Sequence, residues 1–116
     1  MTIIRHRPSK ILSGAVEANG MVYIAGQVAD TLPAGAGAQT EEILGKIDAL
    51  LKLAGSGKSN VVYAQIWVSD IRLRDEVNQA WLAWVDPDNL PARACVQAAL
   101  ANPQMSVEIA VTAAKA

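Results

Sequence analysis

Two stretches near the end of the chain alternate between apolar and polar residues with the period of a β-strand. The first spans 91–98 and the second spans 107–112, and the Asn-Pro-Gln sequence at 102–104 has the composition of a turn. Pairing the two strands as a hairpin places four side chains together on one face: Arg93, Cys95, Gln97 and Glu108. This pairing constrains the fold most, because the other elements must then support that face.

Two of these side chains, Arg93 and Glu108, are charged and lie within a strand. A charge in such a position is costly to bury unless a partner or a ligand satisfies it. The sequence therefore predicts either a structural ion pair of Arg93, with Glu108 or with another copy of the chain, or a ligand site built on Arg93 and Glu108. Cys95 is interpreted as a small buried side chain, because a cysteine nucleophile needs a nearby base and His6, the only histidine, is distant in the chain.

The rest of the chain predicts four further strands and two helices in a single domain of residues 1–116. The strands are expected at 3–6, 14–18, 21–25 and 61–69, and the helices at 40–54 and 73–85. Asn19-Gly20 is a strong signal for a two-residue hairpin turn, and Gly55 stands where a glycine commonly ends a helix. Gly26 interrupts the third strand, which indicates a bulge or a close backbone approach. The order β-β-β-α-β-α-β-β defines an α+β fold.

The composition excludes several classes of protein. A hydrophobic fraction of 52% with 18% charged residues is typical of a folded globule, and a net charge of −1 argues against a nucleic-acid-binding surface. One cysteine and one histidine argue against a disulfide and against a transition-metal site. No apolar run has the length of a membrane span or of a signal peptide, so we expect a cytoplasmic protein.

The two helices are too few to cover both faces of the expected sheet. Six strands form a sheet roughly 25–30 Å wide, and two helices of about 10 Å diameter cover only one face of it. The uncovered face is expected to carry small and aromatic side chains, namely Tyr23, Ala25, Tyr63, Trp67 and Cys95. Such a face predicts a symmetric homo-oligomer, which would place Arg93 and Glu108 at a subunit boundary.

Several short motifs stand in the chain in this order: Asn19-Gly20, 23–27 (Tyr-Ile-Ala-Gly-Gln), Ala54-Gly55, Asp70, Val77-Asn78, 91–96 (Pro-Ala-Arg-Ala-Cys-Val) and 107–109 (Val-Glu-Ile). In order and spacing they resemble the RidA/YjgF family, whose members are also described as endoribonuclease L-PSP or as reactive-intermediate deaminases. The resemblance extends over nearly the whole chain. The segment 96–103 is most similar to a short, YoaB-like branch of that family.

The resemblance implies a chorismate-mutase-like α+β fold, assembled as a homotrimer with three clefts between subunits. It also implies hydrolysis of enamines and imines of the 2-aminoacrylate type to 2-keto acids and ammonia, without a metal or a cofactor. Arg93 would bind the substrate carboxylate in a bidentate pair, and Glu108 would orient or deprotonate the attacking water. The backbone at Cys95 and at Gly26 would position the imine and the water, and Asn78 would help to shape the cleft.

Two positions depart from the pattern of the well-studied deaminases. Leu12 stands where the early loop of those proteins supplies a tyrosine, and Ala25 stands where a serine often precedes the Gly-Gln pair. The substrate contacts of those residues are then either missing in this chain or supplied by Tyr23 or Ser13 instead.

Two other functions remain open. One is a non-catalytic trimer that binds or senses small carboxylates and keto acids through Arg93. The other is an endoribonuclease, as one family description says. The ribonuclease hypothesis is not supported, because the net charge is −1 and the sequence indicates no His/Lys acid–base pair. The tryptophans are interpreted as core or interface residues and not as a stacking platform for bases, because no lysines or arginines alternate with them.

Overall fold

A computed structural model describes all 116 residues and confirms the predicted order of elements. Six strands and two α-helices follow one another as β1 Ile3–Pro8, β2 Ser13–Ala18, β3 Met21–Gln27, α1 Ala36–Leu53, β4 Val61–Val68, α2 Arg74–Trp84, β5 Ala92–Gln97 and β6 Val107–Ala114. Two short 3₁₀ helices, η1 Lys58–Asn60 and η2 Ile71–Leu73, precede β4 and α2.

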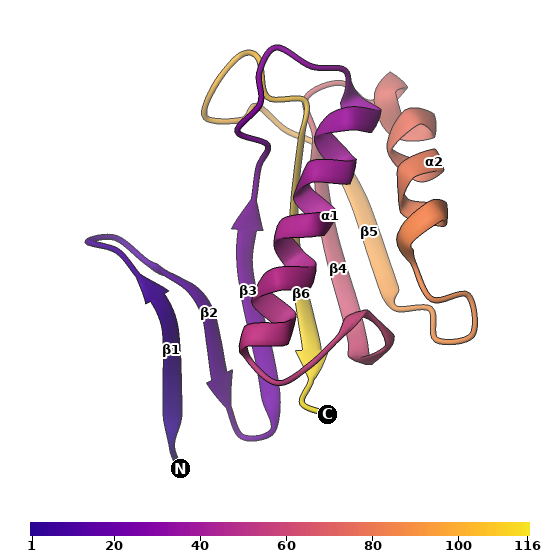
Figure 1. Cartoon of the computed structure of the whole chain (residues 1–116). Coiled ribbons are helices and arrows are strands. Elements are labelled where there is room, and N and C mark those ends of the chain that lie inside the picture. Colours follow the sequence, from indigo (N-terminus) through magenta and orange to yellow (C-terminus); the bar gives the residue numbers. More distant parts are fainter.

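All six strands form one sheet in the order β1-β2-β3-β6-β4-β5, in which only β4 and β5 run parallel (Figure 1). The predicted hairpin between 91–98 and 107–112 is therefore wrong, because β4 lies between β5 and β6. The reason is the helix between β4 and β5. A strand, a helix and a second strand form a crossover that returns the chain to the same edge, so β5 adds to β4 in parallel. The segment 98–106 then passes over the end of β4 to reach β6.

The register also corrects the predicted face of the sheet. Arg93 and Cys95 lie level with Ala64 and Ile66 of β4, which are fully buried on the helix side. Glu108 lies on the opposite side, level with Trp67. Arg93 and Glu108 are thus separated by the sheet itself and do not share a face. Cys95, which was expected on the uncovered face, packs against the core instead.

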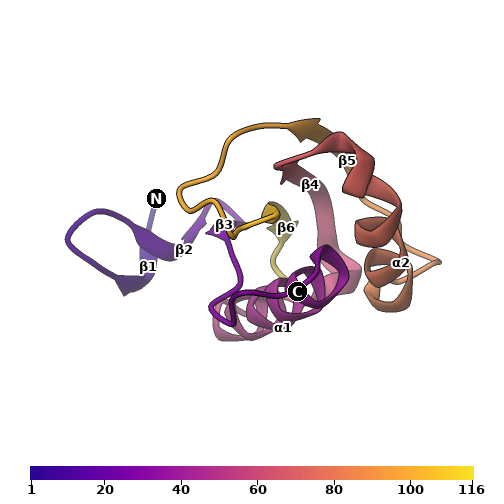
Figure 2. The same cartoon turned by 90° about the horizontal axis from the view of Figure 1, so that it is seen from above.

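Both helices lie on one side of the sheet (Figure 2), and the core forms between them and the inner faces of the strands. The apolar stripe of α1 that the spacing predicted is buried completely at Ile43, Ile47 and Leu51. The helix begins at Ala36 and not near residue 40, because its first turn consists of small residues that give no periodic signal. Neither helix combines the length and the hydropathy that a membrane crossing requires.

The three glycine signals in the sequence are confirmed. Asn19 and Gly20 both have positive φ, at 53° and 78°, as a tight two-residue hairpin turn requires. Gly55, with φ of 78°, ends α1, and the amides of Gly55 and Ser56 donate back to the carbonyls of Lys52 and Leu51. The pairing of β3 with β6 shifts register between Ile24 and Gln27, which places an irregularity at Gly26.

The face of the sheet that carries no helix is rich in aromatic residues. Tyr23 and Tyr63 are 48% and 39% exposed, and Trp67 is half-buried on the same face. Val96 of β5 adds to this face, since it lies level with Trp67. The expectation of an uncovered apolar face is confirmed, apart from Cys95.

The outermost strand is joined to the rest of the protein by a buried carboxylate. Glu17 of β2 is only 7% exposed, and its oxygens lie 2.5 Å from His6 Nε2 and 2.5 Å from Lys115 Nζ. The hydrogen bond from Lys115, followed by that from His6, lowers the pKa of the Glu17 carboxyl below its ordinary value of 4.5. Because the folded pKa is the lower one, this stabilisation is complete above about pH 4.5 and is lost as the pH falls through the folded pKa.

We predict that Glu17→Gln lowers the thermal unfolding midpoint at pH 7 and that the difference from the unsubstituted protein shrinks below pH 4.5. Thermal unfolding followed by circular dichroism across this pH range measures the effect. Glu41→Gln is the matched control, because Glu41 is exposed on α1 and takes part in no ion pair. A midpoint difference that stays constant down to pH 3 would contradict this role of Glu17.

Candidate functional site

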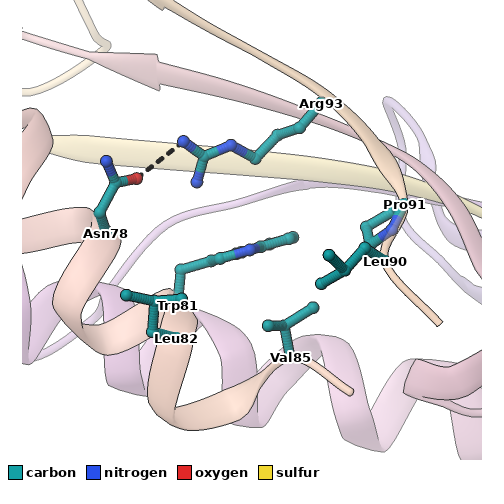
Figure 3. Close-up of a pocket in the computed structure, with 7 residues that line it drawn as sticks. All are labelled: Asn78, Trp81, Leu82, Val85, Leu90, Pro91 and Arg93. Atoms are coloured by element: carbon teal, nitrogen blue, oxygen red, sulfur yellow. Dashed lines mark hydrogen bonds between the residues drawn. The ribbon is translucent and has the colours of Figure 1, made fainter. Parts of the chain in front are cut away.

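Arg93 projects from β5 toward α2, where an amide and an aromatic ring hold its guanidinium group. Arg93 Nη2 donates to Asn78 Oδ1 over 2.7 Å, and the guanidinium carbon lies 5.3 Å from the centroid of the Trp81 ring (Figure 3). Stacking over the indole ring is favourable for the cation, and the hydrogen bond to Asn78 fixes its rotation. The guanidinium is therefore oriented by its own chain before any ligand arrives.

Most of the hydrogen-bonding capacity of Arg93 is left unused. A guanidinium carries five N–H donors, and Asn78 Oδ1 is the one side-chain acceptor that the structure gives Arg93. The ion pairs of the chain are formed by other residues, so no carboxylate neutralises the cation. The predicted structural ion pair with Glu108 is absent within the chain. A half-buried cation with free donors is suited to binding an anion.

The start of α2 is fixed to the end of β5, which positions Asn78 relative to Arg93. The backbone amide of Ile71 donates to Gln97 Oε1 over 2.9 Å and so joins η2 to the strand. Asp70 caps η2 by accepting from the Arg72 amide, and the hydrogen bonds of Arg72 lower the pKa of Asp70 to about 2. The helix that carries Asn78 therefore begins from an anchored turn.

An open hollow of about 340 Å³ lies beside Arg93, between α2, the segment after it and the start of β5. Arg93 and Asn78 form its polar end, and Trp81 lies along its floor (Figure 3). Leu90 and Pro91 lie at the other end of the indole ring. The hollow thus has one cationic end and one apolar end.

Glu108 forms a second cluster with Gly26 on the other side of the sheet. Glu108 is half-buried and takes part in none of the ion pairs of the chain. A Cβ atom at Gly26 would collide with the Glu108 carboxylate and would lie 3.1 Å from its Cδ. The backbone of β3 therefore approaches the carboxylate at the bulge, and only glycine leaves room for it.

Tyr23 and Cys95 lie outside these two clusters. Tyr23 is level with Thr112, which is roughly 13 Å along β6 from Glu108 at the rise of a strand. The Cys95 side chain is half-buried against the core, so only its backbone borders the edge of the sheet. His6 is held by Glu17, and no three His, Cys, Asp or Glu side chains are grouped in a way that could hold a metal ion.

The sequence did not reveal the part that Trp81 takes in the site. Trp81 was interpreted as a core or interface residue, and it is indeed 6% exposed, but one face of its ring also supports Arg93. The available signal was its position three residues after Asn78, because residues three apart share a face of a helix. The contribution of Leu90 and Pro91 to the hollow gave no such signal.

The fold and the site together define a class of protein: an α+β domain whose six-stranded mixed sheet presents an unpaired arginine on one side and an unpaired glutamate on the other. A family model described as Endoribonuclease L-PSP matches residues 4–115. A RutC family protein from Haemophilus influenzae is 46% identical over 114 residues, which are 97% of this chain and 98% of that protein.

The RutC family protein YoaB from Escherichia coli is 40% identical over 114 residues, covering 98% of this chain and 99% of that protein. Among solved structures, a member of the YjgF protein family from Neisseria meningitidis superposes with a TM-score of 0.97 at 40% identity, covering 100% of this chain and 97% of that one. The chain belongs to this family, variously described as YjgF, RutC and endoribonuclease L-PSP. The resemblance that the motifs indicated is confirmed.

We predict that Gly26→Ala forces the Glu108 side chain out of its position at a cost of about 1 kcal/mol, the range of an off-rotamer side chain. In a Glu108→Ala background the same substitution should cost almost nothing, because the collision is gone. Urea unfolding of the single and double variants measures the coupling. Gly45→Ala is the control, since no atom lies within 4 Å of its added Cβ and alanine favours a helix. Equal costs in both backgrounds would mean that Gly26 is not shaped by Glu108.

Proposed function

We propose that this protein hydrolyses reactive enamines and imines of the 2-aminoacrylate type to 2-keto acids and ammonia, in clefts between the subunits of a homotrimer. The observation that carries the proposal is the state of Arg93. Its guanidinium is oriented by Asn78 and Trp81, has no carboxylate partner in its own chain, and borders an open hollow. Membership of the YjgF/RutC family supports a role of this kind.

Arg93 supplies recognition of the substrate carboxylate. The planar guanidinium donates two parallel hydrogen bonds to a carboxylate, which fixes both the position and the plane of the bound group. The positive charge is not cancelled by Glu108 of the same chain, because the sheet separates these two side chains. β5 is also an edge strand, so backbone groups on its outer side near Cys95 are available to a bound imine.

Glu108 supplies the base, and it reaches the substrate from a neighbouring subunit. Within one chain Arg93 and Glu108 face opposite sides of the sheet, so one ligand can contact both only across an interface between copies. The uncovered face that carries Tyr63 and Trp67 also needs another chain to shield it from water. A closed homotrimer satisfies both requirements and agrees with what the resemblance implies.

The reaction consumes one water molecule for each imine. Glu108 accepts a proton from the water as its oxygen attacks the imine carbon, and the C=N bond becomes a C–N single bond. Glu108 returns that proton to the nitrogen, which gives a carbinolamine with a hydroxyl and an amino group on the same carbon. A second proton then passes from the hydroxyl to the amino group, the C–N bond breaks, and the electron pair of the O–H bond forms the C=O bond. The products are ammonia and a keto acid, whose new carbonyl oxygen derives from the water. The backbone of Gly26 lies against the Glu108 carboxylate, and the absence of a Cβ atom there lets the carboxylate keep this position.

A second candidate is a trimer that binds small carboxylates without converting them. It is favoured by one specific observation, namely that the Arg93, Asn78 and Trp81 cluster is complete within one chain. Glu108, in contrast, needs an interface to come near it. Binding therefore requires less of the assembly than catalysis does.

We predict that the protein has about three times the mass of its 12.2 kDa chain in solution. Tyr63→Asp, on the uncovered face, should shift it toward the monomer by placing a charge in the interface, while Leu53→Asp, exposed on α1, should leave the mass unchanged. Multi-angle light scattering measures both. A monomer at micromolar concentration for the unsubstituted chain would remove the clefts from the proposal.

We predict that Glu108→Gln lowers the rate of ammonia release by a factor of about 10² to 10⁴ but retains carboxylate binding, because the amide keeps the shape and cannot accept the proton. Arg93→Ala should lose both ammonia release and carboxylate binding. Arg93→Lys should bind carboxylates weakly, because a single ammonium group replaces the planar guanidinium with its two parallel donors. Imines generated in place by an amino-acid oxidase serve as substrates, and calorimetry with pyruvate measures binding.

Arg74→Ala and Glu41→Gln are the matched controls, since both residues are exposed and lie outside the two clusters. Binding of pyruvate without any acceleration of imine hydrolysis would favour the second candidate. Unchanged binding by Arg93→Ala would place the ligand elsewhere.

A further inference from the structure

We propose that Gln39 is a positioning residue for Glu108: its buried amide joins the segment that enters β6 to the segment that leaves β3, and thereby holds the Glu108 carboxylate against the backbone of Gly26. Gln39 lies near the start of α1, on the other side of the sheet from Glu108, so it acts through the backbone and touches no substrate. This inference rests on the proposed function, because it takes Glu108 as the base.

The first step is the complete hydrogen bonding of a buried amide. Gln39 is only 1% exposed, and its Nε2 donates to the carbonyl oxygens of Ala34 and Gln104 over 2.8 and 3.1 Å. Its Oε1 accepts from the backbone amide of Ser106 over 2.8 Å. These three backbone groups lie outside the helices and strands, and none of the backbone–backbone hydrogen bonds there uses them. The side chain of Gln39 is therefore their partner within the chain.

The second step is the place to which the joined segments lead. The segment 28–35 leaves β3 and the segment 98–106 enters β6, both at the end of the sheet where α1 begins (Figure 1). Ser106 stands two residues before Glu108, and its carbonyl oxygen also accepts from the backbone amide of Ser69 over 3.0 Å. Ser106 is thus held from two sides, by α1 and by the end of β4, directly before β6 begins.

The third step is that Glu108 depends on its backbone for its position. Its carboxylate takes part in none of the ion pairs of the chain, and it lies so close to Gly26 that a Cβ atom there would collide with it. The pairing of β3 with β6 is irregular at this point, since the register shifts between Ile24 and Gln27. A bulge disrupts the ladder locally, so the ladder alone fixes the two strands less firmly there. Gln39 supplies the additional connection between them.

The carboxylate anchor on the other side of the sheet does not depend on these contacts. Arg93 is held by Asn78 and Trp81 of α2, and Gln39 bonds to none of these three residues. Loss of the Gln39 amide should therefore displace Glu108 and leave recognition of a carboxylate intact. A purely structural role of Gln39 would not separate the two in this way.

The first test measures the position of Glu108 without any assay of activity. Urea unfolding at one fixed chain concentration gives the coupling between Gly26→Ala and Glu108→Ala. In a Gln39→Leu background this coupling should fall to less than half, because the carboxylate is no longer held against Gly26. Thr40→Val is the matched control, since Thr40 is equally buried but its Oγ1 donates to Ala36 of the same helix. The control should leave the coupling unchanged.

The second test separates turnover from binding. Gln39→Leu should lower the rate of ammonia release at saturating imine by a factor of about 10 to 100, the range expected when a reacting group is misplaced. The dissociation constant of pyruvate, measured by calorimetry, should stay unchanged. Gln39→Glu keeps the shape and an oxygen that accepts from the Ser106 amide, so it should retain more of the turnover than Gln39→Leu does.

Gln39→Asn keeps the polarity and is too short to join both segments, so it serves in both tests if Gln39→Leu does not fold. A coupling that persists in these variants, or that is already absent in the unsubstituted background, would overturn the inference. An equal loss in Thr40→Val would also overturn it. If the unsubstituted protein hydrolyses no imine, the proposed function fails, whereas a reduced coupling in Gln39→Leu would still assign to Gln39 the positioning of Glu108.

Discussion

The parallel pairing of β5 with β4 is the constraint on which the site depends. The crossover through α2 decides that β5 lies at the edge of the sheet, with Arg93 directed toward the helix. In this position the Arg93 side chain contacts Asn78 and Trp81, which both lie on α2, the helix of the crossover. The element that connects the two strands thus also provides the surface that holds the cation. Antiparallel pairing of β5 with β6 would have separated Arg93 from this helix.

A charged residue at the helix side of a sheet is tolerated here because β5 is at the edge. The centre of the same face is closed by residues such as Ile66 and Ile109, which are completely buried. At the edge, α2 supplies an aromatic ring for the guanidinium group, which also borders the hollow. The cost of burying the charge is thereby reduced without an acidic partner, which leaves the cation free for an external one.

Most of the fold follows from local patterns in the sequence. The turn at Asn19-Gly20, the bulge at Gly26 and the stripe of α1 each depend on residues that are close in the chain, and each is confirmed. The neighbours of β5 could not be obtained in this way. Alternation shows which residues of one strand share a face, but it does not show which face that is. Grouping Arg93 with Glu108 relied on a hairpin, whereas the strand–helix–strand order favoured a parallel crossover.

The carboxylate of Glu17 links three distant parts of the chain: β1 through His6, β2 on which it lies, and the segment after β6 through Lys115. β1 is exposed along nearly its whole length. The small surface that it buries would not by itself prevent the strand from opening independently of the rest of the sheet. Because Glu17 contacts both His6 and Lys115, opening of β1 also depends on the contact with Lys115, near the C-terminal end of the chain. Near neutral pH the backbone amides of β1 that pair with β2 should therefore exchange with solvent about as slowly as those of β2 itself. In acid they should exchange first, while the core between the sheet and α1 stays closed.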